Sequence, residues 1–191
     1  AAVYDIRESN SNAISSLLKV PGASNTVLES YIPYSKKSMD LFLNRKPDHY
    51  CSLNTSLSMA ANAYKKCMQI DPEYKKKYLI GISVTASLAT TYTKIGDHKF
   101  YISVQTESFT KSIECLLIKG SRSREEEEQL ITEYVLSLVA ECCGIEKNMP
   151  HHDEIPVIYT IKAEKSWKKL LNNDVNFISS DRSTPELIFP G

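Results

Sequence analysis

Residues 78–84, with the sequence YLIGISV, form a nearly continuous apolar run. Such a run is typical of a strand in the middle of a sheet, because other parts of the protein then cover both faces of that strand. We therefore expect a central strand at 78–84, with helices packed on both faces of its sheet.

Segments that favour strands and helices alternate through most of the chain. Stretches rich in β-forming residues lie at 2–6, 26–32, 99–105 and 112–118, and segments with the apolar pattern of helices lie at 13–18, 35–43 and 54–68. This alternation predicts a three-layer α/β/α sandwich with a mixed sheet. The third and fourth of these strands are separated by a short polar turn, which predicts an antiparallel hairpin at the edge of the sheet.

The clearest helix signal begins at Ser123. This serine lies three residues before Glu126, so each side chain can accept a hydrogen bond from the backbone N–H of the other, as in a capping box. One apolar face follows, made of Ile131, Val135, Leu138, Val139 and Cys142, and Gly144 is placed to end the helix.

Charge and composition exclude several classes of protein. The 23 Lys and Arg residues balance 23 Asp and Glu residues, so no long-range field favours nucleic acid or an anionic membrane, and any anion site must be local. No segment is apolar enough to span a bilayer, and the first residues lack the pattern of a signal peptide. Five cysteines without a CxxC pair fit reduced thiols in the cytosol. We expect a cytoplasmic protein without a metal or a cofactor.

The domain organisation follows from length and pattern. A chain of 191 residues, 42% of them hydrophobic, can bury one sizeable core. We place one α/β domain at 1–148. We expect a linker and C-terminal extension at 149–184, with a short helix around 167–171, because the apolar pattern weakens and prolines recur. Residues 185–191 end in a strand-like LIFPG.

Two pairs of adjacent residues invite a chemical interpretation. His151 and His152, followed by Asp153, contain metal-binding side chains, but adjacent histidines rarely face one ion and no further ligand is suitably spaced. A solvated linker is the better interpretation. Cys142 and Cys143 lie at a helix end, where core packing is a better explanation than redox chemistry.

Four segments follow one another in an order that is similar to the C-terminal domain of the CinA family, which has the nicotinamide-mononucleotide amidohydrolase fold. They read VPGAS at 20–24, PYSKKS at 33–38, GISVTASLA at 81–89 and KGSRSREE at 119–126. The resemblance covers roughly residues 2 to 145. It implies the three-layer fold, a nicotinamide nucleotide as ligand, and amide hydrolysis.

The family motifs are only partly kept. Glu-Ser-Cys-Thr-Gly-Gly matches ESNSNA at 8–13, where the Glu-Ser remains and both glycines are replaced. Pro-Gly-Ser-Ser matches PGAS at 21–24, which keeps the second serine. Tyr-Ser-Asn-Glu-Ala-Lys matches YSKKSM at 34–39, so the family lysine is Met39. Thr-Gly-Ile-Ala-Gly-Pro matches TASLAT at 85–90, and Gly-Asp-Arg matches GSR at 120–122.

The resemblance implies a set of site residues. Ser24 or Ser9 would be the nucleophile, Tyr34 and Thr85 would position the amide, and Arg122 would hold the phosphate, together with Ser11, Asn12 and Ser87. We expect these residues to converge on one cleft.

Several of these residues also have a structural explanation. The polar residues at 9–12 are equally suited to capping a helix, and Arg122 is equally suited to pairing with Glu125 or Glu126. A tyrosine after a strand, such as Tyr34, lies where open α/β sheets bind ligands, although packing is the commoner role.

The replaced residues bear directly on the chemistry. Amide hydrolysis needs a nucleophile, a group that takes its proton, and donors for the oxyanion. A buried neutral lysine could serve as the base, and Met39 removes it; Lys36 or Lys37 could substitute only by turning inward. Side chains in place of glycines also narrow the approach of a ligand to backbone N–H groups.

Three hypotheses follow. The first is a degenerate amidase-like domain that binds a nucleotide or packs against a neighbouring domain. The second is an active nicotinamide mononucleotide deamidase, and the third is a structural or oligomerising module, since CinA-like domains often self-associate.

The strand-like LIFPG at 187–191 resembles the first strand of HxGH nucleotidyltransferases. Some eukaryotic proteins join a CinA-like domain to such a nucleotidyltransferase, and their CinA-like half contains similar Val-Pro-Gly-Ala-Ser and Val-Pro-Tyr-Ser segments. The resemblance implies that the chain is the N-terminal part of such a two-domain protein, with residues 185–191 starting the nucleotidyltransferase.

Overall fold

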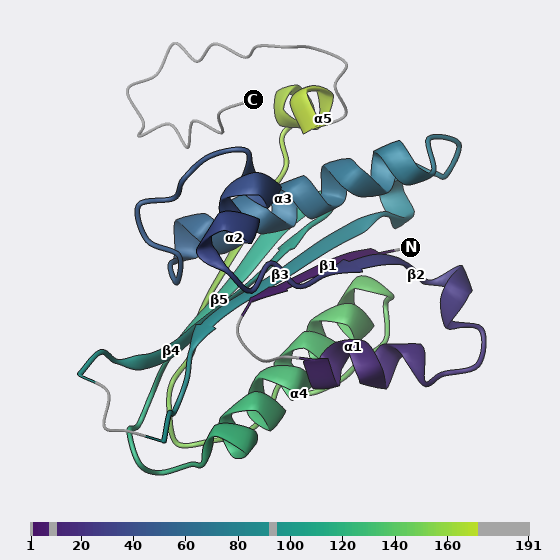
Figure 1. The fold of residues 1–191 in the computed structure, drawn as a ribbon. Coiled ribbons are helices and arrows are strands. Elements are labelled where there is room, and N and C mark those ends of the chain that lie inside the picture. The colour runs from purple at the N-terminus through teal and green to yellow at the C-terminus, as the bar shows by residue number, and fades with distance from the viewer. Residues whose placement is uncertain (1, 8–10, 92–94, 172–191) are drawn as a thin grey trace.

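A six-stranded mixed sheet lies between two layers of helices, which confirms the predicted three-layer α/β/α architecture (Figure 1). The computed structural model describes residues 2–7, 11–91 and 95–171. Its elements are β1 (Ala2–Arg7), α1 (Ser11–Leu18), β2 (Val27–Tyr31), α2 (Lys36–Leu43), α3 (Leu53–Ile70), β3 (Ile80–Ser87), β4 (His98–Gln105), β5 (Phe109–Leu117), α4 (Arg124–Cys142), β6 (Val157–Lys162) and α5 (Lys165–Leu171), with short 3₁₀ turns at Ala23–Asn25 and Lys76–Tyr78.

The sheet has a parallel half and an antiparallel half. The strand order is β2-β1-β3-β4-β5-β6, in which β1 pairs in parallel with β2 and β3, and the remaining neighbours are antiparallel. The carboxyl ends of β1, β2, β3 and β5 therefore lie at the same end of the sheet. The predicted hairpin is confirmed as β4 and β5, which pair from His98 opposite Leu117 to Gln105 opposite Thr110. Its predicted place at the edge of the sheet is wrong, because β6 pairs with β5 on the outer side.

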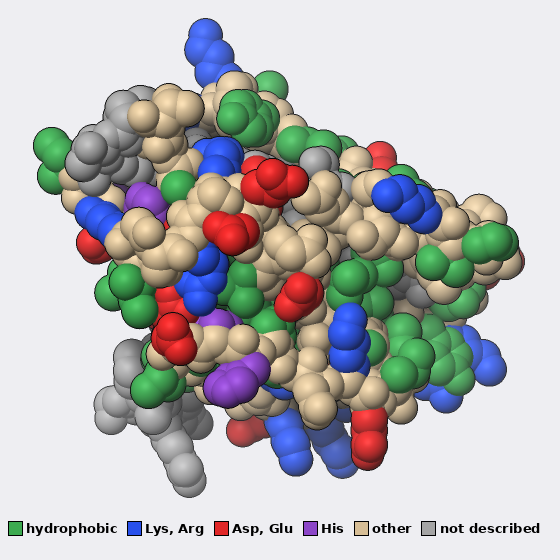
Figure 2. All heavy atoms as spheres, turned by 90° about the horizontal axis from the view of Figure 1, so that it is seen from below, with side chains coloured by type: hydrophobic (Ala, Val, Ile, Leu, Met, Phe, Trp, Pro, Cys, Tyr) green, Lys and Arg blue, Asp and Glu red, His purple; other side chains and the backbone are tan. Residues whose placement is uncertain are grey.

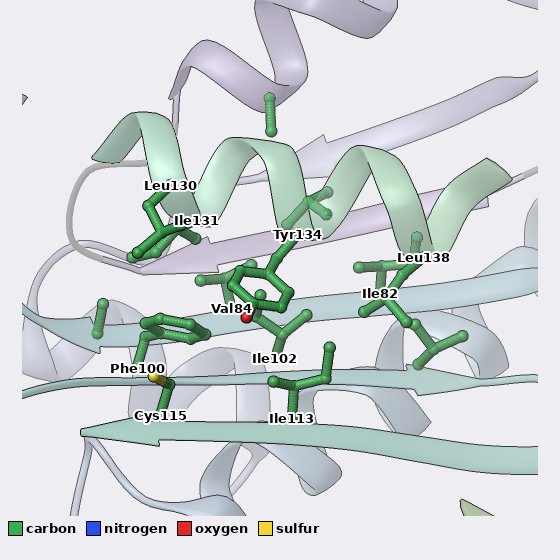
Figure 3. Packing of buried hydrophobic residues seen from close by; sticks show 14 of the residues in the cluster. Ile82, Val84, Phe100, Ile102, Ile113, Cys115, Leu130, Ile131, Tyr134 and Leu138 are labelled. Carbon is green, nitrogen blue, oxygen red and sulfur yellow. The ribbon is translucent and has the colours of Figure 1, made fainter. Parts of the chain in front are cut away.

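The main core lies between the sheet and α4. Figure 3 shows Ile82, Val84, Phe100, Ile102 and Ile113 pointing from the strands towards α4, and Leu130, Ile131, Tyr134 and Leu138 pointing back from the helix. Burying each large apolar side chain contributes roughly 1.5–3 kcal/mol. Helix α1 joins this layer, while α2 and α3 cover the opposite face (Figure 1).

The opposite face of β3 is in close contact with α3. A Cβ atom on Gly81 would overlap the carbonyl oxygen of Ala60 and the backbone nitrogen of Tyr64. Only glycine allows the helix to approach the strand this closely. The glycine within the apolar run at 78–84 is thus explained by helix-on-strand packing.

A cluster of three serine hydroxyls lies between α3 and the sheet. The Oγ of Ser56, on α3, lies 3.0 Å from Ser83 Oγ and donates to Ser103 Oγ at 2.8 Å. Ser83 in turn donates to the carbonyl of Ser56 at 2.6 Å. All three residues are fully buried. The central strand is covered on both faces, as predicted. The covering by α4 is apolar, whereas the covering by α3 combines these hydroxyls with apolar side chains such as Ala63, Tyr64 and Cys67.

Helix starts follow the predicted capping residues. Ser123 and Glu126 form the reciprocal capping box at the start of α4. Ser35 caps α2 by accepting from the N–H of Ser38 at 3.1 Å. The helix starts predicted from these capping residues agree with the observed starts to within one or two residues.

The segment predicted as a solvated linker needs correction. Residues Val157–Lys162 form β6, which pairs with β5 and extends the sheet. The side chain of His152 is only 4% exposed, and its Nε2 lies 2.6 Å from the hydroxyl of Tyr134. The predicted short helix near 167–171 is confirmed as α5. The strand predicted at 185–191 lies outside the described residues.

Candidate functional site

The carboxyl ends of the parallel strands gather several of the predicted site residues. Thr85 and Ser87 lie at the end of β3, and Tyr34 follows the end of β2. Helix α1 begins at Ser11, four positions after β1 ends, so Asn12 lies in its first turn at the same end of the sheet. Ser9 lies outside the described residues. Open α/β sheets commonly bind ligands at this end.

Ser24 lies at the other end of β2. It sits exposed in the 3₁₀ turn Ala23–Asn25 that precedes the strand, whereas Tyr34 follows the strand. Five residues of strand span roughly 16 Å. Within one chain, the structure therefore does not bring Ser24 together with Tyr34 and Thr85.

Thr85 is fully buried on the α3 face of the sheet. Its hydroxyl donates to the carbonyl of Tyr50 at 2.8 Å, just ahead of α3. This hydrogen bond ties the strand to the segment that leads into the helix. The threonine hydroxyl therefore donates its hydrogen bond within the fold and is not exposed to a ligand in solvent.

Tyr34 is the most accessible of the predicted catalytic side chains at this end, with 61% of its surface exposed. Its backbone N–H donates to the carbonyl of Ile32 at 2.8 Å. An open groove between α1 and the end of β2 is lined by Ile14, Ser15, Leu18, Lys19 and Ile32, the last of which precedes Tyr34 by two positions. The groove is mainly apolar, and Tyr34 is not part of its lining.

Met39 stands where the resemblance places a lysine, and it is fully buried. It packs with Leu43 and Met59, with Phe42 and Tyr50 against the same cluster. Lys36 and Lys37 are both exposed, and the Lys36 ammonium lies 5.6 Å from the centroid of the Tyr50 ring. Neither lysine turns inward to replace the missing one.

Arg122 is held by an acidic partner that the sequence analysis did not name. Its guanidinium forms two hydrogen bonds with Glu154, at 2.5 and 2.9 Å. The predicted alternative, a pair with Glu125 or Glu126, is therefore replaced by a pair 32 residues away. This bidentate pair occupies the same guanidinium N–H groups that would bind a phosphate.

Glu154 is the centre of a buried polar network. Besides Arg122, it accepts the N–H of Ile118 at 2.9 Å and lies 2.9 Å from Nδ1 of His152. The hydrogen bond from Arg122 lowers the pKa of Glu154 to about 2, despite burial. The network fixes the segment before β6 against the start of α4.

A second buried carboxylate lies at the end of β3. Glu127 on α4 is fully buried; it accepts the N–H of Ala89 at 2.7 Å and lies 2.8 Å from Nδ1 of His98. Arg124 donates to the carbonyl of Ala89 at 3.0 Å. The start of α4 thus holds the segment that resembles the family's Thr-Gly-Ile-Ala-Gly-Pro loop.

Sequence reasoning missed Glu127, although a signal was present. The residue belongs to a run of four glutamates, yet it is spaced by three, four and seven residues from Leu130, Ile131 and Tyr134. That spacing places it on the buried face of the helix. A glutamate on an apolar face needs a buried partner, and His98 with the Ala89 N–H provides one.

Further observations concern metal binding, membrane spans and surface charge. In the described ranges, no group of three or more His, Cys, Asp or Glu residues could hold a metal ion. Among the helices of the same residues, none has the length and apolar character to cross a membrane. Figure 2 shows acidic and basic side chains interspersed on the face that carries α1 and α4.

Comparison by sequence gives no match, either to a protein-family model or to a curated protein. Comparison by structure gives several matches. The competence/damage inducible protein CihA from Agrobacterium tumefaciens is 12% identical, with a TM-score of 0.57, and the match covers 74% of this chain and 85% of that one. The competence-damaged protein (CinA) superfamily protein from Escherichia coli is 9% identical, with a TM-score of 0.57 and coverages of 73% and 79%.

The corresponding protein from Enterobacter cloacae is 13% identical, with a TM-score of 0.58, and the match covers 74% of this chain and 82% of that chain. Identities of this size carry information about the fold alone. The chain therefore has the fold of CinA-superfamily proteins.

Proposed function

We propose that this chain is a CinA-like domain that no longer hydrolyses amides, and that it acts as a nucleotide-binding accessory to a linked nucleotidyltransferase. The observation that carries the proposal is the buried Met39 in an apolar cluster with Leu43 and Met59. A serine nucleophile needs a nearby group that takes its proton. A thioether surrounded by apolar side chains cannot take that role.

The bonds of the other site residues support the same proposal. The Arg122 fork is bound to Glu154, and the Thr85 hydroxyl is bound to the Tyr50 carbonyl. The Ala89 N–H, in the segment expected to approach a substrate, is bound to Glu127. Groups that would stabilise a substrate or an oxyanion instead stabilise the domain.

Nucleotide binding is supported by the groups that stay accessible. Tyr34 offers an exposed ring, and the groove that begins two residues earlier at Ile32 combines Ile14 and Leu18 with the cation of Lys19. Asn12 lies in the first turn of α1, whose N–H groups favour anions. A base placed along the groove and a phosphate near Lys19 or the start of α1 match these groups.

The first experiment tests hydrolysis. The purified chain is incubated with nicotinamide mononucleotide, and ammonia and nicotinate mononucleotide are measured. We expect neither product above the level of a protein-free control. Turnover that is lost in Ser24→Ala would contradict the proposal and favour an active deamidase.

The second experiment tests binding. A ligand that prefers the folded chain raises its melting temperature, so thermal shift is measured with a panel of pyridine and adenine nucleotides. We expect a shift with at least one nucleotide, reduced in Tyr34→Ala and unchanged in Leu41→Ala, a matched exposed position on α2. The absence of a shift across the panel would leave a purely structural role.

A further inference from the structure

Strand β6 forms one edge of the sheet. It is last in the strand order and pairs only with β5 among the described strands. All six of its residues are exposed. An edge of this kind presents a row of backbone N–H and C=O groups that can pair with another strand.

The edge also carries an apolar strip on one face. Val157, Tyr159 and Ile161 are opposite Glu114, Ser112 and Thr110 of β5, and so point away from the face that packs on α4. They are 45%, 49% and 55% exposed, and Leu116, which alternation places on the same face, is 60% exposed. Protruding apolar side chains on a strand that has a neighbour on one side only, among the described strands, are typical of an interaction surface.

We propose that β6 pairs with β6 of a second copy of this chain, in antiparallel orientation about a two-fold axis perpendicular to the sheet. This arrangement continues the antiparallel order of β3 to β6 across both copies. A two-fold contact uses the same patch on both partners.

The pairing rules restrict the register. Opposite residues of an antiparallel pair have the same hydrogen-bonding direction and point to the same face. Two identical strands must therefore pair residues of equal parity. A register centred on Tyr159 places the two tyrosines opposite each other and sets Val157 opposite Ile161, which joins both apolar strips into one.

Charge supports the same orientation. Exposed Lys162 and Lys165 lie at the carboxyl end of β6, with Glu164 between them, and exposed Asp153 lies just before the amino end. Antiparallel pairing brings the basic end of one copy beside Asp153 of the other. It also keeps Lys162 of one copy away from Lys162 of the other, which avoids direct repulsion.

The size of the edge sets the expected affinity. Six residues of strand span about 20 Å. The area that a contact of this length buries is smaller than the roughly 800 Å² per partner of a standard interface. We therefore expect a dimer with a Kd on the order of 10 μM.

Analytical ultracentrifugation of the full chain from about 1 to about 200 μM tests the proposal. We expect a monomer at the low end and a dimer at the high end. Tyr159→Lys places like charges opposite each other and should raise the Kd about tenfold or more. Leu41→Lys, at an 82% exposed position on α2, is the matched control and should leave the Kd unchanged.

Cross-linking tests the register independently of affinity. In the proposed pairing the two Cα atoms at position 159 lie about 4.5 to 5.5 Å apart, within disulfide range. Tyr159→Cys should form a disulfide-linked dimer on mild oxidation, while Leu41→Cys should not. Circular dichroism confirms that each variant is folded.

Three outcomes would overturn the proposal. The first is a chain that stays monomeric over the whole range, which would assign the edge to another part of the protein or to a different partner. The second is a dimer that persists unchanged in Tyr159→Lys. The third is a wild-type dimer without a cross-link at position 159.

Discussion

The two faces of the sheet are built by different means. Towards α4, the strands present Ile82, Val84 and Ile102, which are removed from water by apolar packing. Towards α3, the same strands present Ser83 and Ser103, whose hydroxyls bond to Ser56 on the helix. The first face is stabilised by buried apolar area. The second combines smaller apolar clusters with hydrogen-bond geometry and a glycine contact.

The largest effect is expected from breaking the apolar face. Phe100→Ala removes a fully buried ring whose centroid lies 5.4 Å from that of Tyr134, and should lower the free energy of unfolding by about 4 kcal/mol. Urea unfolding measures the change. Leu41→Ala, at an exposed position, should change it by less than about 0.5 kcal/mol. Equal effects at both positions would mean that this cluster is not the main core.

The next largest loss of stability is expected from disturbing the close contact between α3 and β3 at Gly81. Gly81→Ala places a methyl group against the backbone of Ala60 and Tyr64, so the helix must move away from β3. We expect a loss of about 3 kcal/mol in the free energy of unfolding, because backbone atoms cannot give way as flexible side chains do. Chemical denaturation provides the measurement, and a loss below about 1 kcal/mol would show that α3 is loosely held.

A third prediction concerns the buried polar network of Glu154 with Arg122 and His152, which lies at the start of α4. The pKa of Glu154 in the folded chain is about 2, below the usual 4.5. Its ionic contacts therefore stabilise the fold above about pH 5, and this stabilisation is lost as the pH falls towards 2. We expect Glu154→Gln to be less stable than wild type by about 2 kcal/mol at pH 7, with the difference shrinking on acidification.

Unfolding midpoints of both proteins between about pH 7 and about pH 3 test this prediction. A constant difference across that range would argue that Glu154 acts through packing and not through its charge. Glu125→Gln, at an exposed position on α4, is the matched control.

The smallest loss of stability is expected from removing one hydroxyl of the serine cluster between α3 and the sheet. Ser56→Ala removes the hydroxyl that lies between Ser83 and Ser103, and leaves buried polar groups with fewer partners. We expect a loss of about 1 kcal/mol. A double-mutant cycle with Ser103→Ala isolates the coupling, and a coupling near zero would mean that the two hydroxyls contribute independently.

Local signals in the sequence predicted most of the elements. The capping box at Ser123 and the apolar spacing of α3 are encoded within a few residues. The alternation of strands and helices then predicted the layers. By contrast, the pair of Arg122 with Glu154 joins residues 32 positions apart, and β6 depends on its partner β5. Neither contact leaves a local pattern.

The placement of Ser24 could have been foreseen. A residue before a strand and a residue after the same strand lie at its opposite ends, and Ser24 and Tyr34 flank β2 in this way. The expectation of one cleft came from the family resemblance and did not include this simple geometric test. The gathering of Tyr34, Thr85 and Ser87 at one end follows from the parallel order of β2 and β3 with β1, which a strand-helix alternation favours.

The burial of Met39 limits what can be engineered at this position. A lysine here would place an ammonium group among Leu43, Met59 and Phe42, where desolvation opposes its charge. A single substitution to lysine would therefore damage the fold before it could add a proton-accepting group. Several neighbouring side chains would have to become polar or smaller first, so the apolar cluster opposes stepwise change at this position.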